Sequence, residues 1–359
     1  MDVDRLRSEF PVLERRAYLN AGTDGPTPRR GLEAAGAALA VELEEGRSGA
    51  AHSERVRAGR SELRARIARL FGCADSEVAL TRSATDGVNA ALHALGLGPG
   101  DEVVTSDEEH PGLLAPLGLA RRRGVRVRTV PWEDLAGAAG PATKLIACSH
   151  VSWVTGRVAP TEDLRATGVP LLYDGAQGLG AIPAEVGALG CDFYAAAGQK
   201  WLCGPDASGY LYVRAERSWE LDGPWPSYMT LAEPGAALEL RQAEGAARFD
   251  MGASPSGANS WSIAAYDVLS EQGFDAVHER GPALAGRLAE RLAERGLDVA
   301  PRGESTLVSW RSHDPEADVL RLAAQGIVVR DLPGRGMVRA SVGAWTSEDE
   351  LERLVAAVA

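Results

Sequence analysis

Residues 171–209 read LLYDGAQGLGAIPAEVGALGCDFYAAAGQKWLCGPDASG, a stretch with two short apolar runs. The first run ends at Asp174, and the second ends at the tripeptide Gly198-Gln199-Lys200. Short apolar runs separated by helical segments are typical of parallel strands that are buried on both faces. Ligands of an open α/β sheet bind at the carboxyl ends of its strands, so Asp174 and Lys200 are predicted to share a site.

An acid and a lysine at neighbouring strand ends suit a cofactor with a basic ring nitrogen and an aldehyde. Pyridoxal 5'-phosphate (PLP) has both, because a lysine forms its Schiff base and an acid pairs with its pyridinium nitrogen. A buried aspartate needs a partner, and a desolvated lysine has a lowered pKa that makes it nucleophilic. The alternatives are a helix N-cap role for Asp174 and a surface position for Lys200. We predict PLP as the cofactor and both residues as catalytic.

The composition is that of an ordinary globular protein, with 45% hydrophobic and 25% charged residues among 359. The formal net charge of −12 argues against a general nucleic-acid binder, which needs a basic face. No apolar run is long enough to span a membrane, and the start lacks the apolar core of a signal peptide, so we expect no membrane partner and a cytoplasmic location. No metal site is expected, because no zinc-type spacing links the four cysteines, which are Cys73, Cys148, Cys191 and Cys203.

Strand-like and helix-like segments alternate along most of the chain, which predicts an α/β fold with six or seven mostly parallel strands flanked by helices. The segment 31–71 has a helical pattern that is broken near Gly46, and residues 215–258 are irregular. The C-terminal part has short strands and two helices, which predicts a small α+β unit. We therefore expect a large domain at 15–270 and a small domain at 271–359, with the N-terminal arm 1–14 packing on the small domain.

Three further features are consistent with the same cofactor. Ser83-Ala84-Thr85-Asp86-Gly87 lies between a strand and a helix, where N–H groups and a hydroxyl can bind a phosphate, although a plain N-cap at Thr85 or Asp86 would explain it as well. His110 follows the strand ending at Thr105 and could stack on a planar ring, with a surface-loop histidine as the alternative. Gln177 could donate a hydrogen bond to a ring hydroxyl.

The motifs SATDGVN, EEHPGLL, HVSWVTG, YDGAQ, CDFYAAAGQKWLCGP and VRASVGAWTSEDELERLV resemble the class V aminotransferase and cysteine desulfurase-like family of type I fold PLP enzymes. The resemblance runs from Tyr18 to the C-terminal helix and implies the large and small domains just described, a seven-stranded sheet and a homodimer. It implies Lys200, His110 and Asp174 as catalytic residues. The implied cofactor-binding residues are Ala84, Thr85, His110, Asp174, Gln177, Gln199, Lys200 and Ser254, and the implied substrate-binding residues are Arg339, Asn20 and Trp153.

The chain also departs from the family pattern. Ala197 and Gln199 stand where many members have a serine and a histidine, so the phosphate site loses donors that Ser254 or Ser256 could replace across a dimer interface. Trp153 stands where desulfurases have an asparagine. The loop 326–337, GIVVRDLPGRGM, lacks the cysteine that forms a persulfide in desulfurases.

The resemblance implies a reaction on a small amino acid through an external aldimine and a quinonoid. The missing loop cysteine favours a desulfurase-like or carbon–sulfur lyase reaction without a persulfide-forming cysteine. Within enzymes, the alternative is an aminotransferase or an amino-acid epimerase. A second class is a PLP-fold protein that binds without catalysis. The intact Lys200 and Asp174 favour an enzyme over such a protein.

Overall fold

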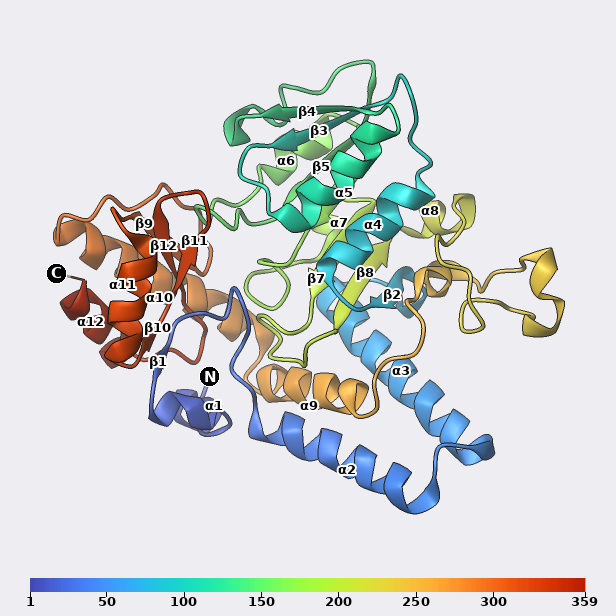
Figure 1. The fold of residues 1–359 in the computed structure, drawn as a ribbon, viewed down its shortest axis with the longest axis horizontal. Helices are drawn as coiled ribbons and strands as arrows, with labels where there is room; N and C mark the ends of the chain where they lie inside the picture. Colours follow the sequence, from blue (N-terminus) through green and yellow to red (C-terminus); the bar gives the residue numbers. More distant parts are fainter. Residues whose placement is uncertain (359) are drawn as a thin grey trace.

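A computed structural model describes residues 1–358, and its largest element is a seven-stranded sheet (Figure 1). The strand order is β2-β8-β7-β6-β5-β3-β4, and β8 is antiparallel to both of its neighbours while the other pairs are parallel. The predicted α/β fold with a mostly parallel seven-stranded sheet is confirmed. The strands are β2 (Val78–Thr81), β3 (Glu102–Ser106), β4 (Arg126–Val130), β5 (Thr143–Ser149), β6 (Leu171–Asp174), β7 (Phe193–Ala197) and β8 (Gly209–Val213).

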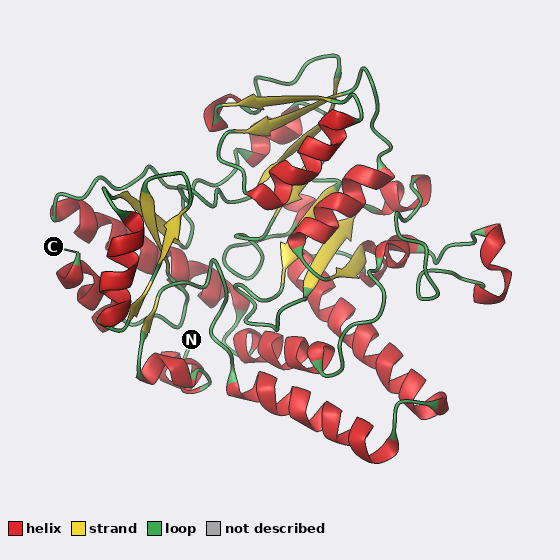
Figure 2. Ribbon diagram, in the orientation of Figure 1, coloured by secondary structure: helices red, strands yellow, loops and turns green. Residues whose placement is uncertain are grey.

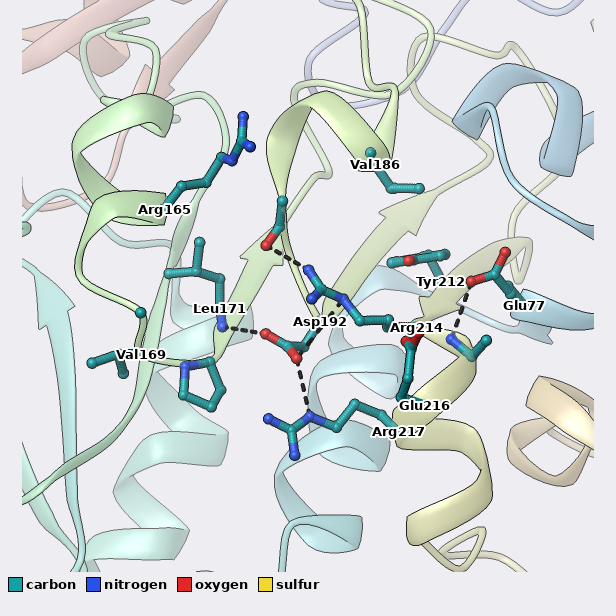
Figure 3. A pocket seen from close by; sticks show the side chains of 15 residues that line it. Glu77, Arg165, Val169, Leu171, Val186, Asp192, Tyr212, Arg214, Glu216 and Arg217 are labelled. Atoms are coloured by element: carbon teal, nitrogen blue, oxygen red, sulfur yellow. Dashed lines mark hydrogen bonds and ion pairs between the residues drawn. The ribbon is translucent and has the colours of Figure 1, made fainter.

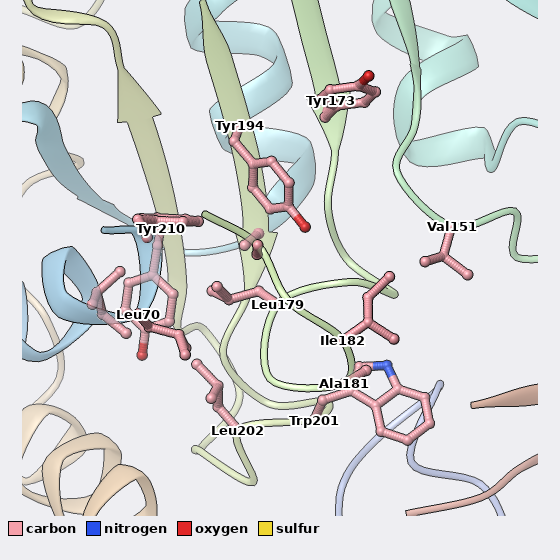
Figure 4. Packing of buried hydrophobic residues seen from close by; sticks show 14 of the residues in the cluster. Leu70, Val151, Tyr173, Leu179, Ala181, Ile182, Tyr194, Trp201, Leu202 and Tyr210 are labelled. Atoms are coloured by element: carbon pink, nitrogen blue, oxygen red, sulfur yellow. The ribbon is translucent and has the colours of Figure 1, made fainter. Parts of the chain in front are cut away.

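The central strands are buried on both faces, as their continuous apolar runs predict. Tyr173 and Tyr194 belong to the core on one face of the sheet, while Leu172 and Phe193 belong to the core on the other. This alternation follows from the two-residue period of a strand. Figure 4 shows both tyrosines projecting from neighbouring strands into the first core, and their ring centroids lie 6.3 Å apart.

Helices cover both faces of the sheet (Figure 2). Residues of α4 and α5 contribute to one core, and residues of α3, α6, α7 and α9 contribute to the other. These helices are α3 (Gly49–Phe71), α4 (Ala84–Ala94), α5 (Pro111–Arg122), α6 (Thr161–Ala166), α7 (Val186–Leu189) and α9 (Ala258–Ser270). Short 3-10 turns occur at η1 (Pro11–Glu14), η2 (Asp75–Glu77), η3 (Trp132–Asp134), η4 (Pro234–Glu239) and η5 (Gly245–Phe249).

The predicted break in the helical segment 31–71 is present. Helix α2 (Arg29–Glu45) ends before Gly46, whose φ of +79° favours glycine, and α3 begins at Gly49. Helix α2 packs against α9 below the sheet (Figure 1). The chain between α8 (Ala215–Glu220) and α9 is largely irregular and projects from the body, as Figure 1 shows in yellow.

The C-terminal part forms a second unit around the three-stranded antiparallel sheet β11-β12-β9. The N-terminal arm packs on it, since Arg7 pairs with Glu350 at 2.9 Å and Phe10 contacts Trp345 at 5.3 Å between ring centroids. The domain boundary at residue 270 stays a prediction. The elements are α1 (Val3–Ser8), β1 (Ala17–Tyr18), α10 (Phe274–Glu294), β9 (Leu307–Arg311), α11 (Pro315–Ala324), β10 (Ile327–Val328), β11 (Arg330–Leu332), β12 (Met337–Ser341) and α12 (Glu348–Ala357).

Two long-range pairings place the loop after β1 against the C-terminal unit. Strand β1 pairs in parallel with β10, and Asn20 forms an isolated bridge with Ser341. The loop 21–25 therefore lies between the two sheets, and Gly25 N donates to Gln199 O at 2.8 Å. Among the helices of residues 1–358, none combines the length and the apolar character that crossing a bilayer requires.

Candidate active site

A cleft of about 280 Å³ lies where the carboxyl ends of β6 and β7 face the C-terminal unit. The large sheet contributes the helix start after β2, the loop after β3 and the ends of β6 and β7. The C-terminal unit contributes β11 and β12, and the loop after β1 closes the remaining side. The lining residues are Gly22, Thr23, Asp24, Ser83, Ala84, Thr85, His110, Trp153, Asp174, Ala176, Gln177, Ala197, Gln199, Lys200, Arg330 and Arg339.

Most of the side chains predicted from the sequence meet in this cleft. Asn20 and Ser254 are not among the lining residues. The Asn20 side chain accepts a hydrogen bond from Thr23 Oγ1 at 2.8 Å within its own loop, and Ser254 lies at a separate cavity between α2, α3 and α9. The roles of both stay predictions. The predicted residues that line the cleft are Ala84, Thr85, His110, Trp153, Asp174, Gln177, Gln199, Lys200 and Arg339.

Asp174 and Lys200 interact through the cleft without forming an ion pair within 4 Å in the described part of the chain. Burial raises the pKa of Asp174, and the Lys200 charge and the N–H of Ala176 oppose that shift. Burial lowers the pKa of Lys200 to about 8, and the charge of Arg339 adds to that effect while Asp174 opposes it. A lysine with this pKa has a reactive neutral fraction near pH 7. A planar group held between the two side chains would contact both.

The start of α4 supplies an anion site. Ser83 is the N-cap, because its Oγ accepts a hydrogen bond from Asp86 N at 3.0 Å, and the predicted cap at Thr85 or Asp86 is therefore wrong. Ser83 has extended backbone and lies two residues before Thr85 and three before Asp86, so the helix begins earlier than the sequence indicated. The N–H groups of Ala84 and Thr85 have no partner inside the helix, and their residues line the cleft. A phosphate would be favoured there by these donors and by the helix dipole.

His110 and Trp153 form a perpendicular pair on one wall, with ring centroids 4.9 Å apart and an interplanar angle of 89°. Gly112 N donates to His110 Nδ1 at 2.9 Å, so the ring proton of the neutral imidazole is on Nε2. Burial and then the charge of Lys200 lower the pKa of His110 to about 4. The imidazole is therefore neutral at pH 7 and suited to packing on an aromatic ring.

Arg339 is fully buried at the base of the cleft, with 0% exposure. Its Nη1 donates to Trp153 O at 2.9 Å, while its Nε and Nη2 have no partner among the described residues. Burial is the main reason that the pKa of Arg339 falls to about 9, so the group is still a cation at neutral pH. A buried guanidinium with free N–H donors on both Nε and Nη2 suits an incoming carboxylate.

The donors present fit PLP together with an amino-acid carboxylate. Asp174 would face the ring nitrogen, Lys200 the aldehyde, and the α4 start with Gln199 the phosphate. Gln177 uses Nε2 to donate to Gly22 O at 2.8 Å and Oε1 to accept from Trp201 at 3.1 Å, which leaves one N–H for a ring hydroxyl. Among the described residues that line the cleft, the buried side-chain atoms without a hydrogen-bond partner are Gln199 Oε1, Trp153 Nε1, Arg339 Nε and Arg339 Nη2.

Close packing at Gly22 leads to the first prediction. A Cβ at this position would lie 2.7 Å from Ser341 Oγ, 2.8 Å from Arg339 Nη2 and 2.9 Å from Gln177 Oε1. Gly22→Ala is therefore expected to displace both cleft side chains and to weaken substrate binding about tenfold, a loss of roughly one charge-assisted hydrogen bond.

The measurement is KM together with a spectrophotometric PLP titration. Gly36→Ala is the matched control, because a Cβ there meets nothing within 4 Å in helix α2, and alanine favours a helix over glycine. Equal KM values in the two variants would contradict the prediction.

Some lining residues were not predicted as site residues. Gly22, Thr23 and Asp24 come from the loop after β1, in which only Asn20 was predicted as a site residue. Arg330 reaches the cleft from β11 and donates from Nη1 to Thr23 Oγ1 at 3.2 Å. The spacing of nine residues between Arg330 and Arg339 would have placed both at one edge of a hairpin, had the register of β11 and β12 been known.

A larger cleft of about 630 Å³ lies at the opposite ends of β6 and β7 (Figure 3). Its arginines are already used inside the protein. Arg214 donates to the carbonyls of Gly190 and Cys191, Arg217 pairs with Asp192 at 3.0 Å, and Arg165 donates to Ala188 O. The reactive groups therefore gather at the smaller cleft.

Comparison with known proteins agrees with this arrangement. The family model described as aminotransferase class-V matches residues 18–354. A cysteine desulfurase of Serratia proteamaculans is 28% identical over 99% of this chain and 97% of its own length. An isopenicillin N epimerase of Streptomyces clavuligerus is 29% identical over 99% of this chain and 98% of its own length.

Solved structures show the same similarity. A complex of the cystine C–S lyase C-DES with its reaction product, cysteine persulfide, is 27% identical with a TM-score of 0.90 and covers 97% of this chain and 98% of that one. A C-DES variant with glycine covalently linked to its PLP cofactor is 28% identical with a TM-score of 0.88, and it covers 98% of each chain.

Proposed function

The chain belongs to the class V aminotransferase family, and from this premise we propose a PLP-dependent enzyme that cleaves the carbon–sulfur bond of cysteine, cystine or a cysteine conjugate. It does so without a persulfide-forming cysteine of its own. The cofactor is PLP, which fits the donors of the cleft and is named in the structure of the C-DES variant. The substrate is a small amino acid.

The placement of the four cysteines carries the proposal. None of them lines the cleft as the structure describes it. A persulfide carrier must be a thiolate when it attacks sulfur. Burial instead raises the pKa of Cys73 to about 12 and raises the pKa values of Cys148, Cys191 and Cys203 as well. Sulfur would therefore leave as a free product, which agrees with the similarity to a C–S lyase.

Different residues of the cleft carry out different steps of the proposed reaction. When bound, PLP withdraws electrons from the α-carbon of the amino acid joined to it. Arg339 holds the substrate carboxylate, and Asp174 keeps the ring nitrogen protonated. Lys200 Nζ takes the α-proton, and the Cβ–S bond breaks with its electron pair leaving on sulfur. With one water consumed, cysteine gives pyruvate, ammonia and hydrogen sulfide, and cystine gives cysteine persulfide in place of sulfide.

The test is incubation of the PLP-loaded protein with cystine, cysteine and cysteine conjugates, followed by measurement of pyruvate and released sulfur. Equal amounts of keto acid and sulfur product are expected. No keto acid from any sulfur substrate, alongside amino transfer to an added keto acid, would overturn the proposal. Inversion of the α-carbon without keto acid would favour the epimerase alternative, which the similarity to isopenicillin N epimerase supports.

The lowered pKa of Lys200 leads to a second prediction, on the rate at which the cofactor-free protein captures PLP. Only the neutral amine attacks an aldehyde, and its fraction rises tenfold per pH unit below the pKa. Because that pKa is about 8, the capture rate should rise about 50-fold from pH 6 to pH 8 and level off about twofold higher above pH 9.

Stopped-flow absorbance of the cofactor measures this rate. An unburied lysine with an ordinary pKa of about 10.4 would show no plateau below pH 10. A rate that continues to rise tenfold per unit above pH 9 would therefore contradict the assignment of Lys200 as a desolvated nucleophile.

We also propose that the active form is a homodimer in which the segment around Ser254 completes the neighbour's phosphate site. Exposed apolar side chains support a second copy, since Leu43 on α2 is 87% exposed and Tyr228 on the projecting segment is 78% exposed. Sedimentation analysis of the PLP-loaded protein tests the assembly. A monomer with undiminished PLP affinity would contradict it.

A further inference from the structure

Glu109 is a buried carboxyl group that directly precedes the cleft residue His110, and it is only 1% exposed. Its Oε2 accepts hydrogen bonds from Ser149 N at 2.8 Å and Ser149 Oγ at 2.5 Å, while Oε1 accepts from Ser106 Oγ. Ser106 ends β3 and Ser149 ends β5. The side chain therefore ties two strand ends together at the edge of the sheet that carries the cleft.

The hydrogen bonds of Glu109 also connect it, through Ser149, to the strand that carries Asp174. Ser149 is paired in register with Asp174 on β6, and the next residue, His150, donates its N–H to Asp174 O at 2.9 Å. One carboxyl group thus connects the backbone that carries His110 to the backbone beside Asp174.

A second glutamate, Glu108, joins the loop after β3 to the turn after β5. Glu108 accepts from Thr155 Oγ1 at 2.6 Å and from Ser152 Oγ, and it lies 3.6 Å from Arg157 Nη1. These contacts hold the turn that carries Trp153, the partner of His110. Because they remain when Glu109 is replaced, a Glu109 variant should keep both loops folded.

We propose that Glu109 is a positioning residue that fixes the ring of His110 against the cofactor by binding the ends of β3 and β5 together. This inference rests on the proposed PLP function and deepens it. Glu109 is not among the residues that line the cleft, so its effect passes through His110. Burial raises the pKa of Glu109 to about 7, and its hydrogen bonds to Ser106 and Ser149 oppose that shift. Glu109 therefore acts through its hydrogen bonds to Ser106 and Ser149 and not through a fixed negative charge.

The same strand offers a matched control at its other end. Glu102 is 2% exposed, begins β3, and accepts from Thr143 Oγ1 of β5 at 2.6 Å. It also pairs with Arg126 at 2.7 Å. Glu102 and Glu109 are thus two buried glutamates that join β3 to β5, and only Glu109 lies at the cleft. Both Glu102→Ala and Glu109→Ala should lower the thermal stability, but only Glu109→Ala should alter the cleft.

The first readout is the titration of His110 in the cofactor-free protein, followed by NMR with labelled histidine ring carbons. The His110→Asn variant assigns its signal among the six histidines. The charges that face His110 are Lys200, Arg330 and Arg339, and they are unchanged in each Glu variant. Loosening of the loop in Glu109→Ala should raise the pKa of His110 from about 4 by about one unit or more toward its ordinary 6.5.

The second readout is the dissociation constant of PLP. Glu109→Ala should weaken binding by about tenfold, the size of effect that one or two lost hydrogen bonds produce. In Glu109→Gln, the dissociation constant of PLP should lie within about threefold of the wild-type value, and the pKa of His110 within a few tenths of a unit. The reason is that the glutamine amide can accept from Ser149 and donate to Ser106. Glu102→Ala should leave both readouts unchanged.

Three results would overturn the proposal: an unshifted His110 titration in Glu109→Ala, the same shift in Glu102→Ala, or a Glu109→Gln variant no better than Glu109→Ala. The proposed function fails separately, if the wild-type protein binds no PLP or forms no product. The histidine titration needs no cofactor, so it decides the role of Glu109 in either case.

Discussion

Replacing Lys200 by alanine should abolish turnover, with a loss of about 10⁴-fold or more, because one side chain supplies both the nucleophile for the cofactor and the proton transfer. The variant should still fold. Burial lowers the pKa of Lys200 to about 8, below its ordinary value, so at neutral pH its ammonium form is the one that folding disfavours. Removal of the side chain also removes that cost.

The chain allows an unusually direct check of this assignment, because Lys144 and Lys200 are its only lysines. Borohydride reduction of the PLP-loaded protein should fix the cofactor to a single peptide, the one that contains Lys200. Lys144 is exposed on β5, and Lys144→Arg should leave turnover and labelling unchanged. Peptide mass spectrometry and a keto-acid assay measure both outcomes. Labelling at Lys144, or turnover by Lys200→Ala within tenfold of wild type, would show that Lys200 is not the reactive lysine.

The residues on the cofactor side of the cleft could be predicted from the sequence, for a physical reason. Asp174 ends the buried strand β6, and Gln177 and Lys200 follow the ends of β6 and β7. A strand end is marked locally by the change from apolar to polar residues. The parallel order then brings these ends to one edge without any knowledge of long-range contacts. His110 follows the same logic at the end of β3.

The rest of the site depends on contacts between residues far apart in the chain. Gly22 and Asp24 reach the cleft because β1 pairs with β10, more than 300 residues later, and two-residue strands leave almost no periodic pattern. For Glu109, a local pattern exists but it indicates the wrong environment. It lies in the acidic run SDEEHPG, whose charges indicate a solvated loop, and its partner Ser149 is 40 residues away.

Arg339→Ala should raise KM for the amino-acid substrate by about 100-fold or more, since it removes a charged, bidentate hydrogen-bond donor from a buried site. PLP binding should weaken far less than the KM rises, because the proposed cofactor contacts come from the large sheet and the loss of the Arg339 charge affects the cofactor only by raising the pKa of Lys200. Arg339→Lys should give an intermediate KM, because an ammonium group cannot present two parallel donors. Steady-state kinetics with cystine and a PLP titration measure these effects.

The control for Arg339 lies on the neighbouring strand of the same small sheet. Arg311 of β9 pairs with Met337 of β12, and its side chain is 62% exposed, so Arg311→Ala should leave KM unchanged. Arg339 approaches the cleft from β12, whereas Asp174 and Lys200 approach it from β6 and β7. The residues proposed to bind the substrate carboxylate and those proposed to bind the cofactor therefore come from different sheets. Single substitutions should thus affect KM and PLP affinity separately. A fall in PLP affinity equal to the rise in KM would mean that Arg339 supports the cofactor instead of the substrate carboxylate.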